Sequence, residues 1–212
     1  TNVSHDIKTP LTSIINYVDL LQKEDIDNEK VREYLDVLDR QSSRLKKLIQ
    51  DLLEASKAST GSINVELEEL DAAVMLSQVA GEYKEKFEKN NLDLIIKNDV
   101  TPVMIQADGR HLWRVFDNLM NNINKYAQPC TRVYIDIIPK DSGAIITFKN
   151  VSATPLNISS DELKERFVRG DSSRNTEGSG LGLSIAESLM KLMNGTLELT
   201  VDGDLFKVTL EF

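Results

Sequence analysis

The chain has 212 residues, of which 41% are hydrophobic and 28% are charged, and these proportions are typical of globular proteins. A formal net charge of −9 and a pI near 4.8 argue against a general nucleic-acid surface, because contacts with phosphates need clustered lysine and arginine. The single cysteine, Cys130, excludes an internal disulfide and is expected to be a small buried residue, and no apolar run approaches the roughly 20 residues of a membrane span.

The first 58 residues predict a helical hairpin. Residues at spacings of three and four give an apolar face to each of two stretches, which are separated by a polar turn at 24–28. Asp27 or Asn28 is placed to cap the second helix. Because two such helices bury little alone, the pattern predicts a homodimer in which two hairpins form a four-helix bundle. The seam positions are Ile7, Leu11, Ile14, Val18 and Leu21, then Val31, Tyr34, Leu38, Gln41, Leu45, Leu48, Leu52 and Ala55.

Small residues at 59–62 predict a linker between this hairpin domain, residues 1–58, and a domain of mixed α and β structure at 63–212. The order of elements predicts a sheet with helices on one face, an α+β two-layer sandwich. The polar stretch 150–179 is expected to be irregular apart from a short helix at 161–167. Strands are expected at 63–67, 92–96, 103–105, 132–138, 144–149, 196–200 and 205–212, and helices at 72–90, 108–126 and 183–193.

The first candidate group is His5, Asp6 and Thr9, near the start of the first helix. At about 100° per residue, His5 points away from the apolar seam, and Thr9 lies one turn further along the same face. An exposed imidazole can act as a nucleophile, and a neighbouring carboxylate can accept its other proton. An isolated His-Asp pair is more often an ordinary surface feature.

The second candidate group lies on the helix predicted at 108–126. Asn118, Asn122 and Lys125 follow one another at i, i+4 and i+7 and share a polar face. Amide oxygens suit a hard cation such as Mg²⁺, and a lysine beside them suits phosphate oxygens. The alternative is an asparagine-rich face that is only solvated. His111, near the start of the helix, is expected to be structural or at the surface.

The third candidate group is a glycine-rich turn at 178–182 that leads into a helix. Alternating glycines let the backbone approach a ligand closely, and amides at a helix N-terminus bind anions. The order of residues differs from that of a P-loop or a dinucleotide fold. Arg169 and Arg174, on the preceding loop, can pair with a γ-phosphate when the loop closes, with surface solubility as the alternative for each.

Together these stretches resemble the transmitter module of sensor histidine kinases in bacterial two-component systems, over essentially all 212 residues. Residues 4–12 are similar to the phosphoacceptor box of that family and residues 118–126 to its Asn box. Phe167 is similar to its phenylalanine box and residues 178–183 to its second glycine box. The resemblance implies a dimerisation and phosphotransfer hairpin followed by an ATP-binding domain of the type shared with gyrase and heat-shock chaperone ATPases.

The resemblance implies roles for the first candidate group. His5 would attack the γ-phosphate of ATP and become phosphohistidine, with Asp6 as the assisting base. The phosphoryl group would then pass to an aspartate on the receiver domain of a response regulator. Thr9 matches the position that orients water when such kinases dephosphorylate the regulator.

The resemblance also implies a nucleotide site. Asn118 and Asn122 would hold Mg²⁺, Lys125 and Arg169 would contact phosphates, and Tyr126 would lie near the nucleotide. The implied ATP-binding residues are Asn118, Asn122, Lys125, Tyr126, Asn150, Arg169, Gly178, Gly180, Leu181, Gly182 and Leu183.

The chain departs from the family at the first glycine box. The family pattern is Asp-x-Gly-x-Gly, whereas residues 150–156 read Asn-Val-Ser-Ala-Thr-Pro-Leu. The family aspartate accepts a hydrogen bond from the adenine amine, and Asn150 offers a carbonyl that is a neutral and weaker acceptor. Without the glycines, the start of the following loop is expected to be stiffer.

The sequence favours a homodimeric ATP-dependent protein-histidine kinase with regulator phosphatase activity. The alternative is a non-catalytic or phosphatase-only dimeric signalling scaffold with impaired ATP binding. A gyrase-like or chaperone-like ATPase fits the second domain alone, and those relatives use a Glu where Asn118 stands. The chain begins without Met inside a helical pattern, so we expect the cytoplasmic portion of a membrane-anchored bacterial sensor, with its membrane part in a missing N-terminal region.

Overall fold

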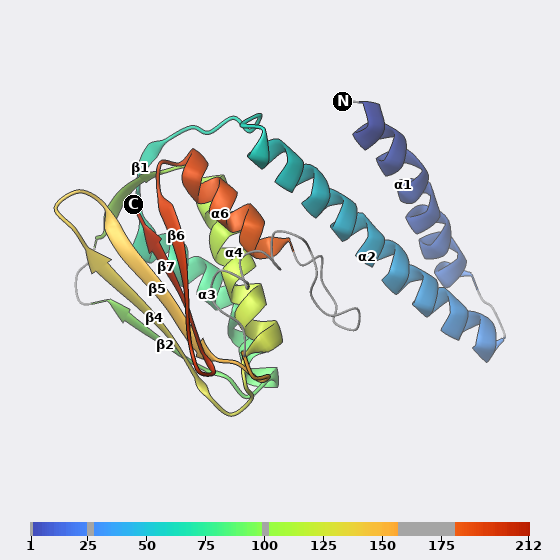
Figure 1. The fold of residues 1–212 in the computed structure, drawn as a ribbon. Helices are drawn as coiled ribbons and strands as arrows, with labels where there is room; N and C mark the ends of the chain where they lie inside the picture. Colours follow the sequence, from blue (N-terminus) through green and yellow to red (C-terminus); the bar gives the residue numbers. More distant parts are fainter. Residues whose placement is uncertain (1, 25–27, 99–101, 157–180) are drawn as a thin grey trace. The chain divides into compact units, whose positions relative to one another are not determined.

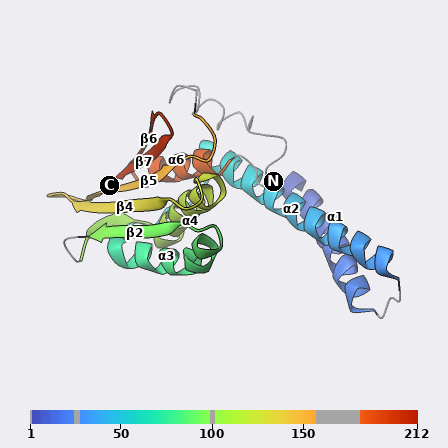
Figure 2. The same cartoon turned by 90° about the horizontal axis from the view of Figure 1, so that it is seen from below.

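The chain divides into two compact units, one ending at Ser56 and the other beginning at Lys57. The computed structural model describes residues 2–24, 28–98, 102–156 and 181–212 (Figures 1 and 2).

The first unit is a hairpin of two helices, α1 (Asn2–Lys23) and α2 (Glu29–Ser59). Asn28 caps α2, because its Oδ1 accepts hydrogen bonds from the backbone N–H groups of Lys30 at 3.1 Å and Val31 at 3.3 Å. The predicted hairpin and the predicted cap at Asn28 are confirmed.

Only part of the predicted apolar seam is buried within the hairpin. Leu11 and Val18 of α1 are buried, whereas Ile14 and Leu21 of the same seam are 49% and 47% exposed. On α2 the buried apolar side chains are Leu35 and Ala58, neither of which belongs to the predicted seam. The exposed apolar seam residues of α2 are Tyr34 (63%), Leu38 (50%), Leu45 (48%) and Leu52 (60%).

The second unit contains two sheets. The larger has the strand order β2-β4-β5-β7-β6, in which β2 and β4 run parallel and the other neighbours are antiparallel. The smaller is an antiparallel pair of β1 and β3. The strands are β1 (Glu68–Asp71), β2 (Asp93–Asn98), β3 (Met104–Ala107), β4 (Arg132–Pro139), β5 (Ala144–Val151), β6 (Thr196–Asp202) and β7 (Leu205–Glu211).

Among the described residues, three helices lie on one face of the larger sheet, namely α3 (Ala72–Lys89), α4 (Gly109–Tyr126) and α6 (Gly182–Leu192) (Figures 1 and 2). The core fills the space between the two layers, where the rings of Phe116 on α4 and Phe148 on β5 are 5.9 Å apart. This arrangement confirms the predicted α+β sandwich.

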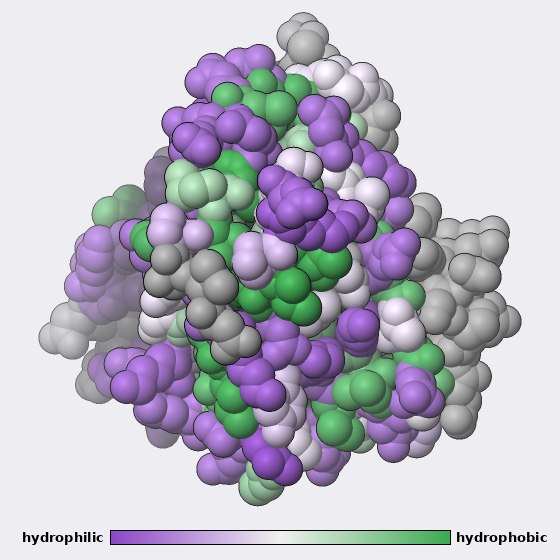
Figure 3. Space-filling model, turned by 90° about the vertical axis from the view of Figure 1, so that its left-hand side faces the viewer, coloured by the Kyte–Doolittle hydropathy of each residue, from purple (hydrophilic) through white to green (hydrophobic). Residues whose placement is uncertain are grey.

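Alternate residues of β4 and β5 remain partly exposed. Among them, Lys149 forms an ion pair with Asp136, and Ile138 is 54% exposed. One side of the molecule shows hydrophobic residues interspersed among hydrophilic ones (Figure 3). Such a mixture is usual for a surface in contact with water.

The predicted strand at 63–67 is wrong, since the first strand begins only after it. The backbone N–H of Glu66 donates a hydrogen bond to Asp108 Oδ2 at 3.0 Å, and the carbonyl of Asn64 lies 3.1 Å from His111 Nε2. These backbone groups are therefore bonded to side chains at the start of α4 instead of to a neighbouring strand.

Cys130 is another correction, because its side chain is exposed and not buried. It lies in the turn before β4 with a φ of 62°, a left-handed conformation. Its backbone N–H donates to the carbonyl of Asn91 at 2.9 Å, so the turn is fixed by the main chain and leaves the thiol outside the core.

Candidate functional site

Helix α4 carries the predicted Asn-rich group and is fixed at its N-terminus by Asp108. The buried Asp108 carboxylate accepts hydrogen bonds from the backbone N–H groups of Glu66, Arg110 and His111. Burial by itself raises the pKa of Asp108, but hydrogen bonds from the Glu66 backbone, the Arg110 guanidinium and the His111 backbone outweigh it and lower the pKa to about 2. The backbone N–H of His111 is one of the donors that hold Asp108, which agrees with the structural role predicted for His111.

A buried polar contact joins α4 to α3 beside the Asn-rich group. The hydroxyl of Tyr83 donates to Asp117 Oδ1 at 2.7 Å, and Arg114 lies 3.4 Å from the other carboxylate oxygen. Burial, together with the hydrogen bond to Asp117, raises the pKa of Tyr83 well above its usual range. The tyrosine therefore stays protonated and holds the helix on which the next residue, Asn118, lies.

Asn118 is buried where α4 packs against α6. A Cβ atom added to Gly182, the first residue of α6, would lie only 3.5 Å from Asn118 Oδ1. Within the described part of the chain, Asn118 Nδ2 is buried and has no hydrogen-bond partner. Two residues from motifs far apart in the sequence therefore lie close together, and the buried Asn118 Nδ2 can still donate a hydrogen bond.

The remaining predicted residues of α4 lie at its C-terminal end. Asn122, Lys125 and Tyr126 are each half-buried, and Lys125 Nζ lies 4.7 Å from the centre of the Tyr126 ring. The contact with the Tyr126 ring keeps the positive charge of Lys125 close to the C-terminal end of α4.

The N-terminus of α6 has the geometry of an anion site. Leu181 is the N-cap residue and makes no side-chain cap, while its carbonyl accepts hydrogen bonds from Ser184 Oγ at 2.8 Å and Ile185 N at 2.9 Å. The first N–H groups of a helix, here those of Gly182 and Leu183, have no acceptor within the helix and attract negative charge.

Asn150 lies at the end of β5, opposite Phe206 of β7, and is 4% exposed. Its Nδ2 donates to the carbonyl of Val151 at 3.2 Å, whereas its Oδ1 is buried without a partner among the described residues. A free buried acceptor suits a ligand that brings a hydrogen-bond donor.

Main-chain hydrogen bonds hold the stretch that follows Asn150. The N–H of Gln128 donates to the carbonyl of Val151 at 2.8 Å, and the N–H of Ala153 donates to the carbonyl of Tyr126 at 2.8 Å. The N–H of Ser152 donates to the carbonyl of Asp204 at 2.7 Å. The stretch that lacks the family glycines is thus tied to the end of α4 and to the β6–β7 turn.

For the other predicted residues the structure describes either the backbone alone or nothing. His5, Asp6 and Thr9 fall within the backbone of α1, on which His5 and Thr9 share a face, but their side chains are not described. The predicted short helix at 161–167 and the residues Phe167, Arg169, Arg174, Gly178 and Gly180 also lie outside the described residues.

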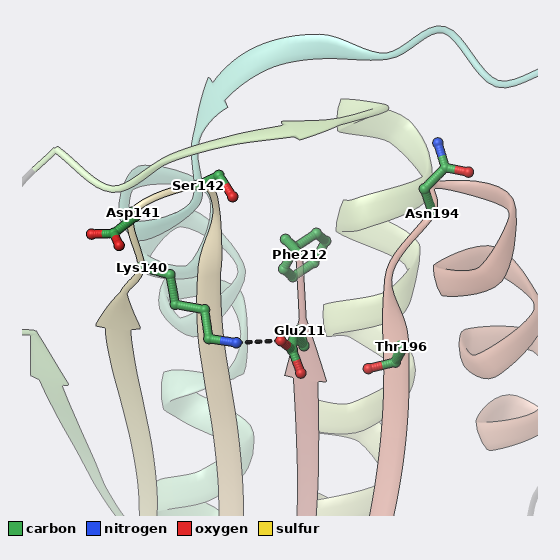
Figure 4. Close-up of a pocket in the computed structure, with 7 residues that line it drawn as sticks. All are labelled: Lys140, Asp141, Ser142, Asn194, Thr196, Glu211 and Phe212. Atoms are coloured by element: carbon green, nitrogen blue, oxygen red, sulfur yellow. Dashed lines mark hydrogen bonds and ion pairs between the residues drawn. The ribbon is translucent and has the colours of Figure 1, made fainter.

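A separate pocket of about 650 Å³ opens at the turn between β4 and β5 and the end of β7 (Figure 4). None of the predicted site residues lines it. Lys140 and Glu211 form an ion pair across it, so its main charges already neutralise each other. Its lining residues are Lys140, Asp141, Ser142, Asn194, Thr196, Glu211 and Phe212.

Comparison with known families matches both units. Residues 1–61 match the His Kinase A phospho-acceptor domain, and residues 107–212 match the histidine kinase-, DNA gyrase B- and HSP90-like ATPase family. The chain therefore belongs to the histidine kinase family and is a two-component transmitter module with these two domains in sequence.

Curated relatives support this membership. The sensor protein VanSC of Enterococcus gallinarum is 32% identical over 198 residues, which cover 92% of this chain and 54% of that protein. The sensor protein VanS of Enterococcus faecium is 30% identical over 205 residues, which cover 92% of this chain and 51% of that protein. The chain thus spans about half the length of these relatives.

Solved structures share the fold. Full-length ShkA in complex with AMPPNP aligns with a TM-score of 0.80 at 21% identity, covering 99% of this chain and 44% of that one. The histidine kinase AdeS of Acinetobacter baumannii aligns with a TM-score of 0.68 at 17% identity, covering 98% and 96%. ThkA in complex with the response regulator TrrA aligns with a TM-score of 0.64 at 21% identity, covering 99% and 60%.

Proposed function

We propose that this chain is the ATP-dependent kinase part of a sensor and phosphorylates its own His5. The closeness of Asn118 to Gly182 carries the proposal, because it places a buried amide beside the N-terminus of α6. Phosphoryl transfer depends mainly on positioning and on neutralising phosphate charge, and these groups offer both. The ShkA structure, which contains AMPPNP, supports nucleotide binding by this fold.

The nucleotide is proposed to lie between α4, α6 and the end of β5. The amide oxygens of Asn118 and Asn122 would hold Mg²⁺, which neutralises phosphate charge when bound. This donor set suits the ion, because amide oxygens are hard ligands of the kind that Mg²⁺ prefers. The other proposed ATP-binding residues are Lys125 and Arg169 at the phosphates, Tyr126 and Asn150 at the nucleoside, and Gly178, Gly180, Leu181, Gly182 and Leu183 at the turn.

The proposed chemistry is a direct displacement. An imidazole nitrogen of His5 attacks the γ-phosphorus while the bond to the bridging oxygen of the β-phosphate breaks, and ADP leaves with the electron pair. Asp6 accepts the other ring proton and stabilises the imidazolium. A carboxylate on a response regulator then takes the phosphoryl group, in keeping with the structure of ThkA bound to the regulator TrrA.

Thr9 is proposed to orient a water molecule that hydrolyses the phosphorylated regulator. It lies one turn after His5 in α1, on the same face of the helix. A hydroxyl at this place can accept and donate hydrogen bonds, as positioning of water requires.

The hairpin is proposed to pair with a second copy as a four-helix bundle. The predicted seam residues Leu38, Leu45 and Leu52 follow at intervals of seven and stay 48–60% exposed in one chain. A second hairpin would remove them from water. In the same scheme, residues 1–58 form the dimerisation domain, 59–62 the linker and 63–212 the ATP-binding domain.

We place the chain on the cytoplasmic side of a membrane-anchored sensor. The similarity to two enterococcal sensor proteins, of which it spans about half, supports this placement. Among the described residues no helix is long and apolar enough to cross a bilayer.

Incubation with γ-labelled ATP and Mg²⁺ tests the kinase activity. We expect label that is acid-labile and base-stable, and that is absent from the His5→Ala variant. Asn118→Ala should also lose the label, because it removes a proposed Mg²⁺ ligand. Label that persists in His5→Ala, or that maps to His111, would contradict the assignment of the nucleophile.

A second candidate is a phosphatase-only or non-catalytic signalling scaffold with impaired ATP binding. The glycine-free stretch after Asn150 favours it, since main-chain hydrogen bonds already tie this segment in place. Calorimetric titration separates the two functions. Binding of Mg-ATP below millimolar concentration supports the kinase, and no binding at millimolar concentration supports the scaffold.

A further inference from the structure

Strand β2 is an outer strand of the larger sheet and lies beside α3 (Figures 1 and 2). Among the described residues it pairs with β4 and with no other strand. The backbone N–H of Asp93 donates to the Thr131 carbonyl at 3.0 Å, on the β4 side. Because the main-chain groups of successive residues in a strand point to opposite sides, those of Leu94 and Ile96 point to the open edge. A further strand could therefore pair with this edge.

The side chains next to the open edge leave apolar surface uncovered. Ile96 is 39% exposed, and Leu94 lines a groove of about 330 Å³ between β2 and α3. Phe87 and Leu92, which are 1% and 6% exposed, also line this groove. Helix α3 thus covers the edge of the core only in part, and a strand with apolar side chains on the same face would complete the cover.

The charges of β2 complement those of a second copy of β2. Asp93 and Lys97 lie two residues before and after Ile95, so all three side chains share the face away from the helices. Within the described chain neither charged side chain forms an ion pair, and Lys97 Nζ lies 5.9 Å from the centre of the Tyr134 ring. If two copies of β2 run antiparallel with Ile95 opposite Ile95, each Asp93 lies opposite the Lys97 of the other copy.

The main chain favours the same register. In it, Leu94 lies opposite Ile96 of the other copy, and these are the residues whose N–H and C=O groups point to the open edge. Their side chains face the groove beside α3, so the pairing would also cover apolar surface. Hydrogen bonds, apolar contacts and charges therefore agree on one alignment.

The other outer strand, β6, shows what an edge that resists pairing looks like. Charges on an edge strand usually prevent association, because like charges meet. Strand β6 carries Glu198 and Asp202 and no basic residue, so two copies of it would bring carboxylates together. In β2 a shift that centres the pair on Asp93 or on Lys97 also brings like charges together. The alignment centred on Ile95 avoids this repulsion.

We propose that two copies of this chain pair through β2 in an antiparallel, two-fold contact that joins their five-stranded sheets. A strand of six residues buries less area than a standard stable interface, so the contact is weak and forms at high protein concentration. It is separate from the hairpin seam and from the proposed nucleotide site, and its failure would leave both of those proposals untouched.

Oxidative cross-linking of the 212-residue chain tests the pairing. In the proposed register the two Ile95 Cα atoms lie about 4.5 Å apart, a distance that a disulfide can span. With Cys130→Ser in the background, Ile95→Cys should form disulfide-linked pairs at least about tenfold faster than Thr200→Cys, the corresponding position between the two acids of β6. Each rate is divided by the rate at which the same thiol reacts with glutathione disulfide, which corrects for thiol reactivity.

Charge variants of Ile95→Cys test the register. Asp93→Lys places like charges opposite each other on both sides of Ile95 and should slow cross-linking about tenfold. Adding Lys97→Asp restores opposite charges and should return the rate to within about threefold of the parent. Thermal unfolding checks each fold, because Asp93 and Lys97 also lie opposite Arg132 and Asp136 of β4. Cross-linking that Asp93→Lys leaves unchanged would overturn the proposal.

Hydrogen exchange tests the wild-type chain without any substitution. The N–H groups of Leu94 and Ile96 should exchange at least about twofold more slowly once the protein is concentrated enough for half of the chains to pair, whereas those of β6 should not change. Exchange at Leu94 and Ile96 that does not depend on protein concentration, or equal cross-linking of Ile95→Cys and Thr200→Cys, would overturn the pairing.

Discussion

The two units differ in how completely each buries its own apolar side chains. In the second unit, Phe116 and Phe148 are 0% and 1% exposed between the helices and the sheet. In the hairpin, Tyr17 and Tyr34 remain 68% and 63% exposed. The second unit therefore has a closed core of its own, whereas the hairpin leaves large apolar side chains exposed that a further surface could cover.

The largest expected effect is on the hairpin seam. Leu38→Glu combined with Leu45→Glu should convert the proposed dimer to a monomer. Full burial of a leucine contributes about 1.5–3 kcal/mol, and Leu38 and Leu45 are already about half buried, so their four copies in a dimer lose roughly 3–6 kcal/mol before charge repulsion is added. Size-exclusion chromatography with light scattering measures the change in mass.

The matched control for the seam is Val74→Glu on α3. Val74 is 53% exposed, similar to the two leucines, but it belongs to the unit with the closed core. We expect this variant to remain dimeric. A dimer that survives the double substitution, or dissociates equally in the control, would show that the subunits pair elsewhere.

The next largest effect concerns the closed core. Phe116→Ala should lower the free energy of unfolding of the second unit by about 3–5 kcal/mol, because it opens a cavity against Phe148. Urea unfolding measures the loss, and the hairpin should keep the chain dimeric. If Phe116→Ala changed the molecular mass in solution but not the urea midpoint, the second unit, and not the hairpin, would hold the two chains together.

The fold was predictable wherever one periodicity dominated. The hairpin, the three helices and the two-layer sandwich follow from local spacing of apolar residues. The segment 63–67 has the composition of a strand, but its backbone is bonded to side chains of Asp108 and His111, 42 and 47 residues further along the chain. Such long-range bonds leave no local pattern in the sequence.

The candidate site was predictable as a set of motifs but not as an arrangement. The motifs indicated Asn118 and Gly182, and the packing of α4 on α6 brings them together. The Asn150 amide donates to a backbone carbonyl that also bonds Gln128, and the partly buried pair of Tyr83 and Asp117 joins two helices. Neither contact has a sequence signature, because each requires the folded chain.

The Tyr83 contact gives a smaller expected effect within the closed unit. Tyr83→Phe removes the hydroxyl that donates to Asp117 at 2.7 Å and should lower the free energy of unfolding by about 1.5–3 kcal/mol, the range for a hydrogen bond to a charged group. Urea unfolding measures it. Tyr134→Phe, on the exposed side of β4, is the control and should change the free energy of unfolding by less than about 0.5 kcal/mol. Equal losses in the two variants would show that the hydrogen bond to Asp117 is not the cause.

The smallest expected effect concerns Asp108, whose carboxylate accepts a hydrogen bond from the backbone of Glu66 and so holds the segment before β1. The pKa of Asp108 is lowered from 3.8 to about 2 in the folded chain, so its carboxylate stabilises the fold above about pH 4, and this stabilisation is lost as the pH falls towards 2. Asp108→Asn should therefore cost about 1–2 kcal/mol at neutral pH, a figure reduced because the Arg110 donor is exposed. The difference from the wild-type chain should shrink towards pH 2 in urea unfolding measured at a series of pH values. Asp141→Asn, in the β4–β5 turn, should show no such difference, and a pH-independent loss in Asp108→Asn would mean that the side chain acts by packing and not by charge.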